Sequence, residues 1–123
     1  MPNHHKLLVW HRANALSLDV HRAARRIRQS DAPGLKSQLL RAVASIPANI
    51  SEGAGDRTRT EFAHYVTIAI GSVNETETHL ALAIGLEFVP AAQAARLVDE
   101  LDQIRRMLFG LRKHLENGDD DAG

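Results

Sequence analysis

Apolar residues recur along this chain in four separate segments, three or four positions apart within each segment. That spacing places the apolar side chains on one side of an α-helix. Polar stretches rich in glycine and proline interrupt the pattern between the segments. We therefore predict amphipathic helices over about residues 7–29, 34–52, 59–86 and 91–116, followed by an acidic tail over 117–123.

The second segment is unusual because its apolar pattern continues across a proline. Its apolar positions are Leu35, Leu39, Val43, Ile46 and Ile50. Proline inside a helix removes one backbone hydrogen bond and clashes with the preceding turn, at a cost of about 3 kcal/mol. A pattern that persists on both sides of Pro47 predicts a helix that is kinked at this residue, and not one that ends there.

The third segment opens with a recognisable helix start. The hydroxyl of Thr58 can accept from the amide of Glu61, and the Glu61 carboxylate can reach back to the amide of Thr58, as in a capping box. Four long amphipathic helices with short connections favour one domain over residues 1–123. The predicted fold class is all-α, an antiparallel up-and-down four-helix bundle.

The first and third helices carry apolar residues beyond the single stripe that a bundle core requires. These extra positions are Leu8, Ala15 and Leu18 in the first helix, and Tyr65, Ile68, Ala83 and Ile84 in the third. An extra apolar edge either packs against another subunit or widens the face turned to the core. The pattern leaves both readings open.

Composition narrows the class of protein. With 44% hydrophobic and 24% charged residues in 123, the chain has the balance of a globular domain. The absence of cysteine excludes disulfides, thiolate metal sites and thiol nucleophiles. The apolar run at residues 7–10 is too short for the core of a signal peptide, so we expect a cytoplasmic protein.

Charge is balanced overall but unevenly distributed. Residues 1–50 hold eight Lys and Arg against two Asp, whereas residues 51–123 hold seven against thirteen Asp and Glu. The asymmetry fits either complementary surfaces, within a bundle or between subunits, or a basic face that attracts a polyanion.

A basic cluster is the leading candidate for a binding site. It consists of Arg22, Arg25, Arg26, Arg28 and Lys36. Cations are favoured near a helix C-terminus, but four arginines within seven residues exceed that requirement. The guanidinium fork suits phosphate. Because no aromatic residue lies nearby in the sequence, we predict nucleic-acid binding directed at the phosphate backbone and strongly dependent on salt.

Polar residues also share faces of the second and third helices. They are Arg41, Ser45, Asn49 and Glu52 on the second helix, and Ser72, Glu75 and His79 on the third. We predict a structural polar network in which Arg41 pairs with Glu75 or Glu52. Together with Asn49, this network would set the helix register and the kink.

The alternative from another class is a metal-dependent enzyme. Glu61 and His64 have the Glu-x-x-His spacing of di-iron bundles, and Glu75 and His79 lie four residues apart. The fourth helix supplies no second Glu-x-x-His, and no nucleophile elbow or phosphate-binding loop is present. We therefore predict no catalytic residues, no metal and no cofactor.

Several motifs together resemble a known family. In order they are Leu8-Val9-Trp10 with Ala13, Arg41, Ser45-Ile46-Pro47-x-Asn49-Ile50-x-Glu52-Gly53, Glu61-Phe62 and Ala69-x-Gly71-Ser72-x-x-Glu75-x-Glu77. Over about residues 6–115 the chain resembles the bacterial four-helix bundle protein family. Its members include proteins encoded in intervening sequences of large-subunit ribosomal RNA genes, and the accessory protein of diversity-generating retroelements is a more distant relative.

The resemblance implies a homo-oligomer, a pentameric ring of bundles, without known enzymatic activity. We therefore hypothesise a non-catalytic binding or scaffold module whose partner is RNA or a nucleoprotein. The rival within the non-enzyme class is an assembly subunit whose basic face meets an acidic protein.

Overall fold

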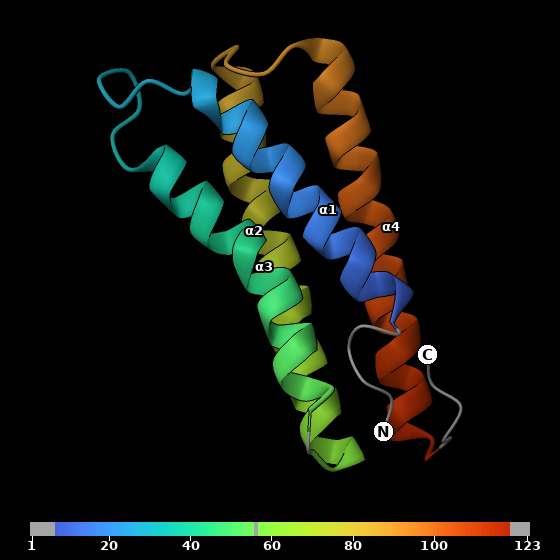
Figure 1. Cartoon of the computed structure of the whole chain (residues 1–123). Coiled ribbons are helices and arrows are strands. Elements are labelled where there is room, and N and C mark those ends of the chain that lie inside the picture. Colours follow the sequence, from blue (N-terminus) through green and yellow to red (C-terminus); the bar gives the residue numbers. More distant parts are fainter. Residues whose placement is uncertain (1–6, 56, 119–123) are drawn as a thin grey trace.

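The computed structural model describes residues 7–55 and 57–118 and forms a bundle of four α-helices. They are α1 (Leu8–Ala23), α2 (Leu35–Gly53), α3 (Arg59–Gly85) and α4 (Ala91–Glu116). Successive helices run antiparallel, α1 and α3 each pack against α2 and α4, and α1 lies diagonally opposite α3 (Figure 1). The predicted all-α antiparallel bundle is confirmed, and residues 119–123 of the predicted acidic tail lie outside the described residues.

The core consists of the apolar stripes read from the sequence. On α4 the buried positions include Leu97, Leu101, Ile104, Leu108, Leu111 and Leu115. On α3 they include Phe62, Val66, Ala69, Val73, Thr76, Leu80 and Ala83. Burial of these faces supplies most of the stability of the helices, because helices in proteins are stabilised mainly by packing of their apolar face and less by intrinsic propensity. No helix among the described residues is long and apolar enough to cross a membrane.

Helix α2 runs without interruption through Pro47, which is itself buried. Ile46 and Ile50 flank this proline, and both are completely buried. The prediction that the helix continues past the proline is confirmed. The kink at Pro47 stays a prediction.

The predicted end of the first helix at residue 29 is wrong. The α-helix ends at Ala23, and a 3₁₀ turn, η2 (Ala24–Arg26), follows it. Ile27 then adopts an extended backbone, yet its side chain is buried in the core. The helix was predicted to continue because the apolar spacing includes Ile27, and apolar spacing indicates which side chains are buried. A tighter 3₁₀ turn can bury the same position as a further turn of α-helix.

The connection from α2 to α3 is held by side chains of both helices. The predicted capping box is confirmed, since Thr58 Oγ1 accepts from the Glu61 amide and Glu61 Oε1 accepts from the Thr58 amide, each at 3.1 Å. These hydrogen bonds lower the pKa of the Glu61 carboxyl below its ordinary value. The Arg57 guanidinium binds Glu52 and lies 5.2 Å from the centre of the Tyr65 ring.

The end of α3 is a Schellman motif with an uncommon residue at its centre. The Glu87 amide donates to the Ile84 carbonyl and the Phe88 amide to the Ala83 carbonyl, at 2.9 and 3.0 Å. Glu87 adopts a φ of 67°, in the left-handed region where glycine is usual. A side chain in this region costs about 1–2 kcal/mol, so strain is localised at this turn.

Arg12 forms a polar contact between α1 and α4. Its Nε donates to Glu100 Oε1 at 2.8 Å, and its Nη2 donates to Gln103 Oε1 at 2.6 Å. The side chains of Arg12 and Glu100 are only about one-third exposed, so this pair is less screened than a surface ion pair. It fixes the position of α1 along α4.

Candidate functional site

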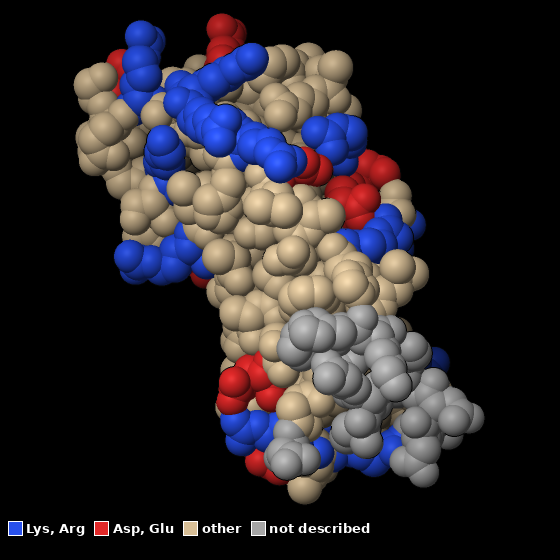
Figure 2. All heavy atoms as spheres, viewed as in Figure 1, with Lys and Arg blue, Asp and Glu red and all other residues tan. Residues whose placement is uncertain are grey.

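The basic cluster lies at the end of the bundle where α1 ends and α2 begins (Figure 1). We call Arg22, Arg25, Arg26, Arg28 and Lys36 the basic end. Figure 2 shows Lys and Arg side chains gathered on this part of the molecule, whereas the middle of the same face carries few charges. The structure brings three of the five predicted residues into one surface pocket, namely Arg25, Arg26 and Arg28.

The cations of the basic end differ in their partners. Arg22 pairs with Asp19 at 3.4 Å and Arg28 with Asp31 at 2.8 Å, both among exposed side chains. Within the described ranges, Arg25, Arg26 and Lys36 make no ion pair or side-chain hydrogen bond. Exposed ion pairs contribute little to stability, so a ligand can replace them at low cost. At least three charges of the basic end are therefore available to a ligand.

The basic cluster has an aromatic neighbour in space, although no aromatic residue lies near it in the sequence. The pocket of Arg25, Arg26 and Arg28 is completed by Glu87, Phe88 and Pro90 from the connection between α3 and α4. Phe88 is about sixty positions away in the chain but adjacent in the fold. A search for nearby aromatic residues along the sequence could not find it, because only the assembly of the bundle brings the connection between α3 and α4 beside the end of α1.

The predicted polar network forms in part. Ser45 Oγ and Ser72 Oγ lie 2.6 Å apart across the contact between α2 and α3. Asn49 Nδ2 donates to the Ser45 carbonyl at 2.8 Å, and Ser45 Oγ can donate to the Ala42 carbonyl at 2.7 Å. These half-buried groups satisfy one another. That they set the register and the kink stays a prediction.

The charged members of that network do not join it. Arg41 is exposed and, within residues 7–55 and 57–118, makes no ion pair or hydrogen bond through its side chain. Glu52 instead binds Arg57, and Glu75 lies 3.6 Å from His79. Residues four apart lie on the same side of a helix, yet Ser45 contacts Ser72 of α3 while Arg41, one turn earlier, is exposed to solvent.

The residues of the metal-site alternative are separated along α3. Glu61 is used in the capping box, and fourteen residues, or about 21 Å of helix, separate it from Glu75. His64 is exposed, whereas His79 is half-buried beside Glu75. Across the part of the chain that the structure describes, no three His, Asp or Glu side chains lie close enough to hold one metal ion.

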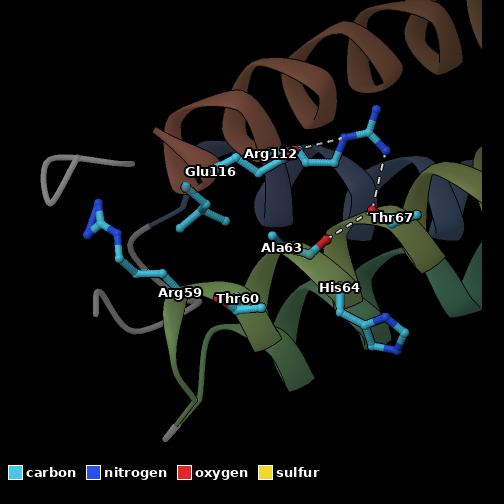
Figure 3. A pocket seen from close by; sticks show the side chains of 8 residues that line it. Arg59, Thr60, Ala63, His64, Thr67, Arg112 and Glu116 are labelled. Carbon is cyan, nitrogen blue, oxygen red and sulfur yellow. Dashed lines mark hydrogen bonds and ion pairs between the residues drawn. The ribbon is translucent and has the colours of Figure 1, made fainter. Parts of the chain in front are cut away.

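A second pocket lies at the opposite end, between the start of α3 and the end of α4 (Figure 3). Arg112 Nη1 donates to Thr67 Oγ1 at 3.3 Å, and its Nε lies 3.6 Å from Glu116. The side chains of Arg59 and His64 point to other sides and do not converge with Arg112 on one point (Figure 3). The pocket therefore lacks the convergent polar groups of a small-molecule site.

Two helices expose apolar side chains on opposite sides of the bundle. The α1 strip consists of Leu8, Ala15 and Leu18, and the α3 strip consists of Ile68, Leu82 and Leu86. The exposure of Leu8, Ala15, Leu18 and Ile68 agrees with the extra edges read from the sequence. Ala83 instead belongs to the core, and Tyr65 and Ile84 are half-buried.

Comparisons with protein families and with solved structures both gave matches. A family model described as 23S rRNA-intervening sequence protein matches residues 5–110. A crystal structure of a protein of unknown function from the S23 ribosomal protein family of Bacteroides thetaiotaomicron superposes with a TM-score of 0.78. It is 24% identical, and the alignment covers 86% of this chain and 99% of that chain, a likeness of fold. The comparison with curated proteins found no match.

Proposed function

Because the chain belongs to the 23S rRNA-intervening sequence protein family, we propose that it is a non-catalytic, self-associating scaffold that binds RNA or a nucleoprotein through its basic end. The observation that carries the proposal is the concentration of unpaired cations there. Arg25 and Arg26 lie side by side in η2, directly after α1, and Lys36 lies in the first turn of α2. Cations that are not committed to internal ion pairs can exchange their counterions for phosphates, which favours RNA binding.

The two apolar strips support self-association. Leu8 and Leu18 of the α1 strip are 63% and 52% exposed, and Leu82 and Leu86 of the α3 strip are 52% and 46% exposed. Large apolar side chains exposed together are typical of interfaces. Because α1 and α3 lie diagonally opposite, the two strips form different surfaces. Contact between different surfaces is heterologous, and such contacts close into a ring when the rotation between subunits permits.

RNA binding is tested with two double variants that each lose two positive charges, one at the basic end and one elsewhere. Replacing both Arg25 and Arg26 with glutamine should weaken binding of a structured RNA about tenfold at low salt. It should also make the slope of the logarithm of the association constant against the logarithm of the salt concentration shallower by about 0.7–0.9 per arginine. The measurement is a gel shift or fluorescence titration at two salt concentrations.

The matched control replaces Arg106 and Lys113, exposed cations of α4, with glutamine. It removes the same charge but should leave RNA affinity within about twofold, since these positions are far from the basic end. Equal effects of the two pairs would attribute binding to net charge alone. No shift of wild-type protein even at low salt would exclude RNA and favour the alternative, an assembly subunit whose basic end meets an acidic protein.

The assembly is tested by light scattering after size exclusion. Wild-type protein should have a mass of five times the 13.5 kDa chain. Leu18→Glu in the α1 strip and Leu82→Glu in the α3 strip should each yield monomers, because a buried unpaired carboxylate is strongly unfavourable. An equimolar mixture of the two variants should form dimers, since one intact α1 strip and one intact α3 strip remain.

The control for this experiment is Ala44→Glu on the exposed side of α2, which should leave the mass unchanged. A wild-type monomer at micromolar concentration would rule out the ring. A mixture that stays monomeric would show that the two strips do not contact each other.

A further inference from the structure

The pocket at the basic end combines cations with an aromatic residue. Arg25, Arg26 and Arg28 reach it from the end of α1 and the following connection, and Phe88 and Pro90 reach it from the connection between α3 and α4. A surface that attracts phosphate through charge alone needs no aromatic group. The presence of Phe88 therefore requires a separate explanation.

Phe88 is held in place by both backbone and packing. Its amide closes the Schellman motif of α3 on the Ala83 carbonyl. The residue is half-buried, packs against the core and also lines the pocket. The hydrophobic contact of a Schellman motif explains the buried part of the ring. It does not explain why Phe88 also lines a pocket with three arginines.

The charges around the ring set the orientation of a ligand. Arg25 and Arg26 have no ion-pair partner among the described residues, whereas Arg28 is paired with Asp31. Glu87, in its left-handed conformation, adds one carboxylate to the pocket. Phosphates are therefore favoured on the side of Arg25 and Arg26 and disfavoured beside Glu87.

We propose that this pocket binds an unpaired nucleotide of single-stranded RNA, with the base stacked on Phe88 and the flanking phosphates held by Arg25 and Arg26. Bases stack on aromatic side chains only when their faces are free, which excludes a base inside a duplex. Every base has such a face, so the pocket discriminates strand state and not base sequence. The inference rests on the proposed RNA binding and adds its preferred substrate, an unpaired strand.

The test compares two labelled RNAs of equal length, an unstructured single strand and a fully paired duplex. Phe88→Leu keeps an apolar side chain for the core contact but removes the ring. It should weaken binding of the single strand roughly 5- to 100-fold and leave duplex binding unchanged. The matched control is Phe109→Leu, an exposed phenylalanine of α4 that lies near Arg112 and outside the pocket. It should change neither affinity.

The possible outcomes separate this inference from the proposed function. If wild-type protein binds both RNAs and Phe88→Leu weakens both equally or neither, stacking is wrong while RNA binding stands. If wild-type protein binds neither RNA at low salt, both proposals fail. Adenosine monophosphate should not displace the single strand at equal concentration, and displacement would assign the pocket to free nucleotides. Circular dichroism and the melting temperature should be the same for the two Phe variants, which confirms that both fold.

Discussion

Replacing Ile50 with alanine is expected to lower the free energy of unfolding by about 2–5 kcal/mol, the cost of deleting a large apolar side chain from a packed core. Ile50 lies one turn beyond Pro47 and has 0% exposure. Its burial depends on α2 continuing in register past the proline. Ile50→Val should cost less, about 0.5–1.5 kcal/mol, because it removes only one methyl group. Urea denaturation at a fixed protein concentration measures both values.

The matched control is Val98→Ala on α4, a truncation of a β-branched residue that is 40% exposed. It should change the free energy of unfolding by no more than about 0.5 kcal/mol, as is usual for surface positions. If Ile50→Ala were as mild as this control, the half of α2 after Pro47 would not be part of the core.

Gly53→Ala is the second substitution with a large expected effect, a loss of about 1–3 kcal/mol from overpacking. A Cβ on Gly53 would lie 2.7 Å from Tyr65 Cβ and 2.9 Å from Phe62 Cδ1. Tyr65 Cβ is attached directly to the backbone of α3 and cannot move by side-chain rotation alone. The two helices would have to separate where α2 ends.

The same substitution at Gly110 is expected to stabilise the protein, in contrast to Gly53→Ala. Gly110 is exposed within α4, and a Cβ there would meet no atom within 4 Å. Alanine should raise the free energy of unfolding by about 0.5–1 kcal/mol, since it reduces the entropy of the unfolded chain. A stabilising effect at both glycines, measured by denaturation, would contradict the close approach of α2 and α3.

Predictions from the sequence were accurate for contacts between residues close together in the chain and less accurate for features that depend on tertiary packing. Thr58 and Glu61 of the capping box are three positions apart, and both hydrogen bonds form as predicted. The end of the first helix was misplaced because Ile27 is buried outside the α-helix. Apolar spacing indicates burial directly and hydrogen-bonding pattern only indirectly.

In the candidate site, too, contacts between sequence neighbours were predictable and contacts between distant residues were not. The arginines at the end of α1 are adjacent in sequence, so their clustering was evident. Arg41 was expected to pair with Glu75 or Glu52, and the fold brings it to neither. The contact of Arg12 with Glu100 was missed, although both residues are charged and flank apolar stripes. Many cations and carboxylates satisfy that description, and only the relative rotation of two helices selects a pair.

The sequence by itself determined the four helices, the faces they bury and the clustering of positive charge near the end of the first helix. These properties depend on contacts within a few turns of one helix, where residue spacing defines geometry. Only the tertiary structure decided that Phe88 lies among Arg25, Arg26 and Arg28, that Gly53 permits two helices to approach, and that the α1 and α3 strips face opposite ways. Those relations depend on how the helices pack against one another. Packing is defined by the relative rotation and translation of the helices, which the apolar pattern of each single helix does not specify.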